Sequence, residues 1–319
     1  MALKKNYSAL NYLKAFAAFF VVFHHCATYC GLMTTNDTIG FACYFIGTAT
    51  NGLFFLISGY LCHEQKLMPY YSKKLTKILI PFVVFSVMKL VYGIFISDEH
   101  AHAASLWEQI YDAFVCGSLY WFIYSILITF MISPLFWKLK KWNILLLVLC
   151  FGFYSVVDLF DIKLPNEFQI DQTLFHIGYF IAGYVLQMYG EKISAFAQKH
   201  KDLLFFVSLA LVTGVLGLRL MTVDNIPYIV KVPLAFAQIY LLFLFAKKLP
   251  ENNAALTFVG NHSLQVFFFD SFFKVILVAI MRPTTLVQLL LVVLLNISLT
   301  CIACAIIKKI PYVKVLVGL

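Results

Sequence analysis

The chain has 319 residues, of which 62% are hydrophobic and 12% are charged, and its formal net charge is +9. Soluble globular domains are about half apolar and a quarter charged, so this composition excludes an ordinary soluble protein and predicts a membrane protein with little soluble mass. The apolar runs follow one another without a linker rich in proline, glycine or serine. We therefore expect a single membrane domain over residues 1–319.

Ten segments are long and apolar enough to cross a bilayer, which requires about 20 residues for a helix. They are Leu10–Cys30, Ile39–Cys62, Ile78–Ser97, Leu119–Phe136, Trp142–Phe160, Gln172–Tyr189, Leu203–Met221, Pro227–Ala246, Phe258–Ile280 and Thr285–Ile307. Runs of this length without alternation predict helices rather than barrel strands. The expected fold is therefore all-α, a polytopic membrane protein with about ten transmembrane helices.

The first of these segments follows Lys4 and Lys5, as the apolar part of a signal peptide would. No small-residue cleavage site comes after it, and the run is long, so we expect it to be retained as a helix.

The cations predict how the chain is oriented. If the N-terminus is cytoplasmic, the inner connections hold 17 of the 24 Lys and Arg residues, whereas the outer side holds only Lys163, Arg219, Lys231 and Arg282. Cytoplasmic loops carry an excess of Lys and Arg, so both termini are predicted to be cytoplasmic. The positive charge is thus explained by topology, and we expect no nucleic-acid partner.

Metal binding is not expected either. The outer loop between the third and fourth spans holds His100 and His102, but no third ligand at a suitable spacing follows. The eight cysteines lie mostly within or at the edges of apolar spans, which is not the pattern of a disulfide framework.

The first span carries three ionisable residues, which are costly inside a bilayer. Ten residues separate Lys14 from His25, and at about 100° per residue these two side chains share one helix face about 16 Å apart. His24 points about 100° away from that face. The face suits an extended ligand with an anionic head near Lys14 and a reactive end near His25. The alternatives are a snorkelling lysine and an interhelical hydrogen bond from the histidine.

Two further stretches could bind a ligand. Ser58 and Gly59 lie near the inner end of the second span, where they permit close backbone approach or simple helix packing. Lys74 and Lys77 lie at the mouth of the third span with a spacing that places them on one helix face. Such a cationic pair suits phosphate groups. Taken alone, however, the pair is better explained by the excess of cations on the cytoplasmic side and by attraction to anionic lipid.

Later spans add candidates with less defined roles. Trp121, Asp158 and His176 lie toward the outer ends of their spans, where an acid or an imidazole could orient His25. Asp270 and Lys274 form an i, i+4 pair in mid-span, and we favour a structural ion pair there over a catalytic role.

The ordered set of motifs resembles the acyltransferase-3 family of membrane O-acyltransferases. The family has an arginine, ten residues and a histidine in its first span, then a Leu-Phe-Phe…Ser-Gly-Phe/Tyr pattern and an Arg-x-x-Arg pair before a proline. The matching residues here are Lys14 and His25, then Leu53, Phe54, Phe55, Ser58, Gly59 and Tyr60, then Lys74, Lys77 and Pro81. Residues Tyr120–Phe136 resemble the family's Trp-Phe span, and Val259–Asp270 resemble its Leu-Gly-x-x-Ser…Tyr-x-x-His span.

This chain departs from the family pattern at several positions. Lysine replaces arginine at Lys14, Lys74 and Lys77, which keeps the charge but loses the planar guanidinium fork. Asp270 stands where the family often has histidine.

The resemblance implies an O-acetyltransferase that moves an acyl group, most often acetyl, from cytoplasmic acyl-coenzyme A to a hydroxyl of a glycan or glycolipid. It implies acetyl-CoA or another acyl-CoA as co-substrate and a location in a bacterial cytoplasmic membrane. Carried over to this sequence, His25 is the catalytic base or is itself acylated, and Lys14, Ser58, Lys74 and Lys77 are expected to bind the donor. Apart from the resemblance, we expect Asp158 or His176 to be the partner of His25, and Trp121 and His24 to contact the acceptor.

Two other functions remain open at this point. A transporter for small, amino-acid-like solutes would also place ionisable groups inside a helical bundle, although the halves show no obvious inverted repeat. A non-catalytic subunit of a glycan assembly machine is the third possibility, and it would tolerate loss of His25.

Overall fold

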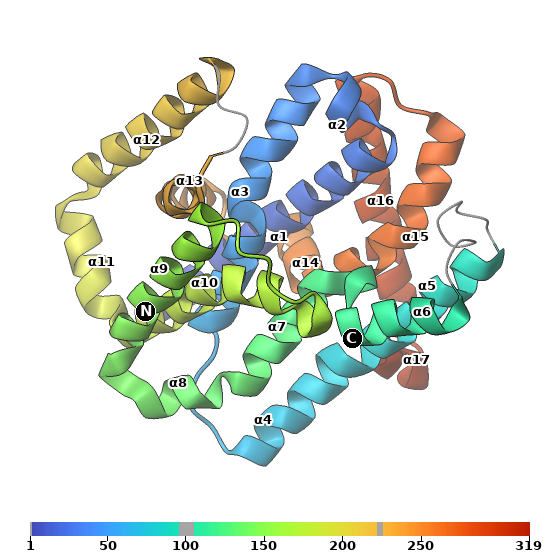
Figure 1. The fold of residues 1–319 in the computed structure, drawn as a ribbon, viewed down its shortest axis with the longest axis horizontal. Helices are drawn as coiled ribbons and strands as arrows, with labels where there is room; N and C mark the ends of the chain where they lie inside the picture. Colours follow the sequence, from blue (N-terminus) through green and yellow to red (C-terminus); the bar gives the residue numbers. More distant parts are fainter. Residues whose placement is uncertain (1, 96–104, 222–225) are drawn as a thin grey trace. The chain divides into compact units, whose positions relative to one another are not determined.

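The computed structural model describes the backbone of residues 2–95, 105–221 and 226–319, and the side chains of residues 8–93, 105–217 and 226–319. Throughout these ranges the regular structure is helical and no strand is present, so the all-α prediction is confirmed (Figure 1). The candidate ligands His100 and His102 lie outside the described residues.

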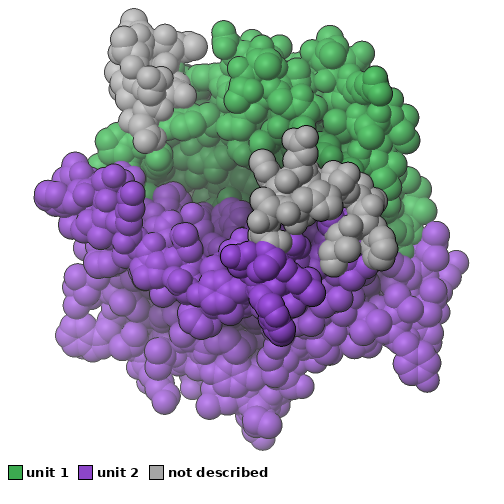
Figure 2. Space-filling model, turned by 45° about the vertical axis from the view of Figure 1, so that its right-hand side comes forward, with its two compact units in different colours: residues 1–61, 182–304 green, residues 62–181, 305–319 purple. Residues whose placement is uncertain are grey.

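The described chain forms two compact units, coloured separately in Figure 2. Unit 1 comprises residues 1–61 and 182–304, and unit 2 comprises residues 62–181 and 305–319. The helices of unit 1 are α1 (Ala2–Tyr29), α2 (Leu32–Thr35), α3 (Asp37–Tyr60), α11 (Gly190–Lys199), α12 (Lys201–Met221), α13 (Tyr228–Lys248), α14 (Ala254–Asn261), α15 (Ser263–Met281) and α16 (Leu286–Ile307, whose last turn belongs to unit 2).

Unit 2 contains more short and irregular helices. They are α4 (Leu67–Lys74), η1 (Leu75–Leu79), α5 (Ile80–Phe95), α6 (Leu106–Tyr111), η2 (Asp112–Cys116), η3 (Ser118–Tyr120), α7 (Trp121–Ile132), α8 (Pro134–Leu139), η4 (Lys140–Trp142), α9 (Asn143–Leu159), η5 (Glu167–Gln169) and α17 (Pro311–Leu316). Helix α10 (Ile170–Met188) begins in unit 2 and ends in unit 1.

Helix α1 lies at the core of unit 1, where it contacts α3, α13, α14 and α15. Its packing faces carry small residues, and Ala17 and Ala18 are fully buried. Small residues allow helix backbones to approach closely inside a membrane, where van der Waals packing rather than the hydrophobic effect drives association. This packing holds the Lys14–His25 helix firmly against its neighbours.

The helices support a multi-pass membrane protein. Seven helices of the described chain are long and apolar enough to cross a membrane, or up to nine if each of two bent pairs is one span. The seven are Ser8–Tyr29, Asp37–Tyr60, Leu67–Gly93, Pro134–Leu159, Tyr228–Lys248, Ser263–Met281 and Leu286–Ile307. Of the expected ten, the segment Gln172–Tyr189 has its counterpart in α10, which is not among them.

Candidate functional site

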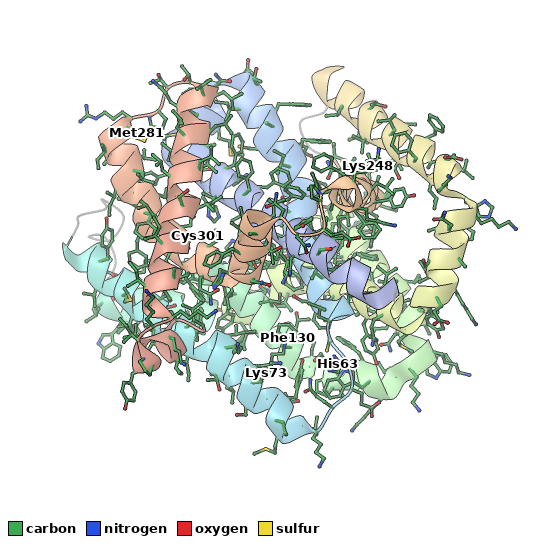
Figure 3. The ribbon with its side chains drawn as sticks, turned by 180° about the vertical axis from the view of Figure 1, so that it is seen from behind. His63, Lys73, Phe130, Lys248, Met281 and Cys301 are labelled. Carbon is green, nitrogen blue, oxygen red and sulfur yellow. The ribbon has the colours of Figure 1, made fainter. Side chains whose placement is uncertain are left out.

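The strongest candidate site lies in unit 1, around His25 on α1. The imidazole Nδ1 of His25 is 2.7 Å from Oδ2 of Asp270 on α15. The second carboxylate oxygen of Asp270 accepts a hydrogen bond of 2.9 Å from the side-chain amide of Asn296 on α16. One chain of polar contacts therefore joins α1 to the consecutive helices α15 and α16, which lie far along the sequence. Helices α15 and α16, which carry the labelled Met281 and Cys301, run beside each other in Figure 3.

The burial of this pair is uneven. The Asp270 side chain is 1% exposed, whereas the His25 side chain is 39% exposed. The carboxylate is thus enclosed by protein while the imidazole reaches the surface of unit 1. When an ionised carboxylate accepts the Nδ1–H of a histidine, the other ring nitrogen, Nε2, keeps its lone pair and can accept a proton. His25 of unit 1 therefore has the geometry of a general base.

Lys274 completes the cluster. Its ammonium nitrogen lies 3.9 Å from Oδ2 of Asp270, the same oxygen that contacts His25, so the expected i, i+4 ion pair is confirmed. The sequence did not predict the contact between Asp270 and His25. The available signals were the mid-span position of Asp270, where the family often has histidine, and the polar Asn296 on the next helix. A spacing rule within one helix cannot find a partner on another.

Lys14 lies in the N-terminal half of α1, and its side chain is half-buried. Among the described residues it has no acidic partner or hydrogen-bond acceptor within reach. A half-buried cation without a counter-ion is a favourable position for an anionic ligand.

His24 faces a different helix from His25, as its position in the sequence predicts. It lies beside Gly47 of α3, and its Nδ1 is buried without a hydrogen-bond partner. Its ring centroid is 6.3 Å from that of His25. Ser58 is half-buried in the last turns of α3. No contact in the structure assigns either residue to a ligand, and both roles stay predictions.

The remaining predicted residues lie in unit 2, and two of them meet there. The rings of Trp121 on α7 and His176 on α10 have centroids 5.6 Å apart. His176 is buried and donates its Nδ1–H to the carbonyl of Gln172 at 2.8 Å. Asp158 is exposed near the end of α9. The acid that contacts His25 is Asp270, and the orienting role expected of Asp158 or His176 stays a prediction.

Lys74 and Lys77 differ in their surroundings. The Lys74 ammonium lies 3.3 Å from the centroid of the Phe130 ring and 5.4 Å from that of Tyr70, and the side chain is half-buried. Lys77 is exposed. A cation held against aromatic rings is attracted by their electron-rich faces. Figure 3 labels Phe130 and also Lys73, which precedes Lys74 in the sequence.

No group of three or more histidine, cysteine, aspartate or glutamate side chains in the described part of the chain could hold a metal ion. A sequence model of the acyltransferase-3 family, described as an acyltransferase domain, matches residues 7–308. No curated protein and no solved structure matches the chain.

Proposed function

This chain belongs to the acyltransferase-3 family, and we propose that it transfers an acetyl group from cytoplasmic acetyl-CoA to a hydroxyl of a cell-surface glycan or glycolipid. The family membership and the apolar helices make it a membrane acyltransferase. The donor, the acceptor and the acetyl specificity are our proposal. The observation that carries it is the contact of 2.7 Å between His25 and the buried Asp270.

The reaction requires a base that takes a proton from the acceptor hydroxyl. In our proposal, Nε2 of neutral His25 takes this proton while the hydroxyl oxygen attacks the thioester carbonyl. The carbon–sulfur bond then breaks, and the imidazolium returns the proton to the departing thiolate. Asp270 fixes the ring orientation and stabilises the imidazolium. In a second route, Nε2 attacks the thioester carbonyl first, the carbon–sulfur bond breaks and the acyl group is carried on His25. The acceptor hydroxyl then attacks this acyl group, and its proton passes to the departed thiolate.

The donor carries phosphate groups, for which cationic side chains are suitable ligands. We propose Lys14, Lys74 and Lys77 for this role, together with the hydroxyl group of Ser58. The half-buried Lys14, which has no counter-ion among the described residues, supports it. For the acceptor we propose Trp121 and His24. The protein would lie in a bacterial cytoplasmic membrane with both termini inside.

The base role is tested by replacing His25 with alanine. General base catalysis contributes about 100- to 10,000-fold to rate, so His25→Ala should lower acetyl transfer by at least 100-fold while membrane expression stays normal. His24→Ala is the comparison variant: it removes an adjacent histidine that is proposed only to bind the acceptor, so a smaller loss is expected. Transfer is measured by mass spectrometry of surface glycans from cells with and without the protein. Activity close to wild type in His25→Ala would exclude the base and the carrier roles together.

A binding measurement separates an enzyme from a transporter. A ligand that binds only the folded state raises its apparent stability, so acetyl-CoA should raise the melting temperature of the detergent-solubilised protein. The same molecule without its thioester acyl group serves as the comparison. No stabilisation by either, together with stabilisation by a small amino acid, would favour transport instead.

A further inference from the structure

Lys274 lies beside Asp270 but takes no direct part in the proposed reaction. Its ammonium lies 3.9 Å from the Asp270 oxygen that also contacts His25, and 5.5 Å from the centroid of the Tyr29 ring near the end of α1. Its side chain is 16% exposed. The carboxylate on one side and the aromatic ring on the other hold the charge next to the His25–Asp270 pair.

Asp270 has one cationic neighbour and two hydrogen-bond contacts among the described residues. Asp270 is buried, and an isolated buried carboxylate is strongly unfavourable unless a cation or hydrogen-bond donors compensate it. Among the described residues, Lys274 is the only lysine or arginine in ion-pair range of Asp270, and His25 and Asn296 supply the two hydrogen-bond contacts. Titratable side chains near His25 and Asp270 include His24 and Cys26 of α1, which are neutral in their ordinary forms.

We propose that Lys274 is a charge-balancing residue that acts through Asp270 and keeps His25 in its neutral, proton-accepting form. This inference rests on the proposed base role of His25. Without Lys274, the full negative charge of Asp270 would attract a proton to His25, and a protonated imidazole cannot serve as a base.

The balance is kept through the reaction. At rest, Asp270 and Lys274 cancel and His25 is neutral. When His25 takes the proton of the acceptor hydroxyl, its new positive charge is matched by the negative charge that develops on the thioester oxygen. The net charge of the site therefore stays at zero. This suits an environment of low dielectric constant, in which uncompensated charge is expensive.

The test is a double-mutant cycle with Lys274→Met, Asp270→Asn and the combined variant. In Lys274→Met we expect kcat to fall at least tenfold, with the KM for acetyl-CoA changed less than threefold. Lys274→Arg keeps the charge and should retain activity within about threefold of wild type. Adding Lys274→Met to Asp270→Asn should cause no further loss, because no carboxylate charge is left to balance.

Lys248→Met is the control, because Lys248 is an exposed lysine at the end of α13 of the same unit, labelled in Figure 3, and should leave kcat unchanged. If Lys274→Met misfolds, kcat of Asp270→Asn can still be compared with kcat of the combined variant, because both lack the buried carboxylate charge. Equal values support the inference. Wild-type kcat in Lys274→Met overturns the inference. So does a multiplicative loss in the combined variant, because Lys274 would then act independently of Asp270. An active His25→Ala variant would instead overturn the proposed base.

Discussion

Gly260 on α14 is a residue whose smallness the packing of unit 1 requires. A Cβ at this position would overlap the backbone carbonyl of Asn11 on α1. The same two segments are tied by Tyr12, whose buried hydroxyl donates to the carbonyl of Pro250 at 2.5 Å and accepts from the N–H of Asn253 at 3.0 Å. The close approach of α14 thus helps to hold the helix that carries Lys14 and His25.

Gly260→Ala should therefore destabilise the protein. Forcing extra atoms into a packed contact costs about 1–3 kcal/mol, and here the obstacle is backbone, which cannot rotate away. Gly152→Ala on α9 is the matched control, because nothing lies within 4 Å of a Cβ there and alanine favours a helix by about 0.5–1 kcal/mol. Thermal unfolding in detergent measures both. Equal melting temperatures for the two variants would contradict the close contact.

Asp270 shows what a sequence can and cannot predict about a site. Its ion pair with Lys274 follows from a spacing of four residues within one helix, which fixes geometry locally. Its contact with His25 joins residues 245 positions apart. That contact depends on which helices pack together, and apolar helices of similar composition carry no sequence pattern that selects their neighbours.

Among the elements, the π-helical turn η1 accounts for the different surroundings of Lys74 and Lys77. An i, i+3 spacing predicts one shared face in an α-helix, but η1 interrupts the regular helix over Leu75–Leu79. Pro81 is the second residue of α5 and has no N–H to donate to the preceding turn. Across this turn Lys74 is half-buried against Phe130, whereas Lys77 is exposed.

Lys74 should therefore contribute more than Lys77 to donor binding. A hydrogen bond to a charged group contributes about 1.5–3 kcal/mol, so Lys74→Ala should raise the KM for acetyl-CoA by tenfold or more, and Lys77→Ala by less. Lys73→Ala serves as the control, because Lys73 is an exposed neighbour that is not proposed as a ligand. Initial rates at varied acetyl-CoA give the three constants. Similar values for Lys74→Ala and Lys73→Ala would argue against the donor site.

The elements also show where the prediction from hydropathy was sufficient. Spans that are uniformly apolar, such as α3 and α16, begin and end within a few residues of their predicted bounds. The fourth span was predicted as Leu119–Phe136, but α7 covers only Trp121–Ile132. Gly117 adopts a left-handed conformation before it, and Pro134 begins a new helix after it. Such breaks arise from single residues that barely change the mean hydropathy of a window.

At the scale of the whole molecule, the distribution of cations is the feature that relates the fold to the membrane. Seventeen of the 24 Lys and Arg residues fall in connections that alternate along the chain. Helix α9 provides a simple test of the alternation, because Lys141 precedes it, Lys163 follows it and both are exposed. Its 17 residues extend over about 25 Å, close to the thickness of the apolar part of a bilayer, and with α8 it forms a candidate span.

We propose that Lys141 faces the cytoplasm and Lys163 the outside, as the excess of inner cations requires. In intact cells, a membrane-impermeant maleimide should label Lys163→Cys but not Lys141→Cys, and permeabilised cells should give labelling of both. The wild-type chain measures the background, which should be low because its eight cysteines are buried or only partly exposed. The opposite pattern would invert the topology and place His25 on the cytoplasmic side of its helix, so that the acceptor would have to be a cytoplasmic molecule.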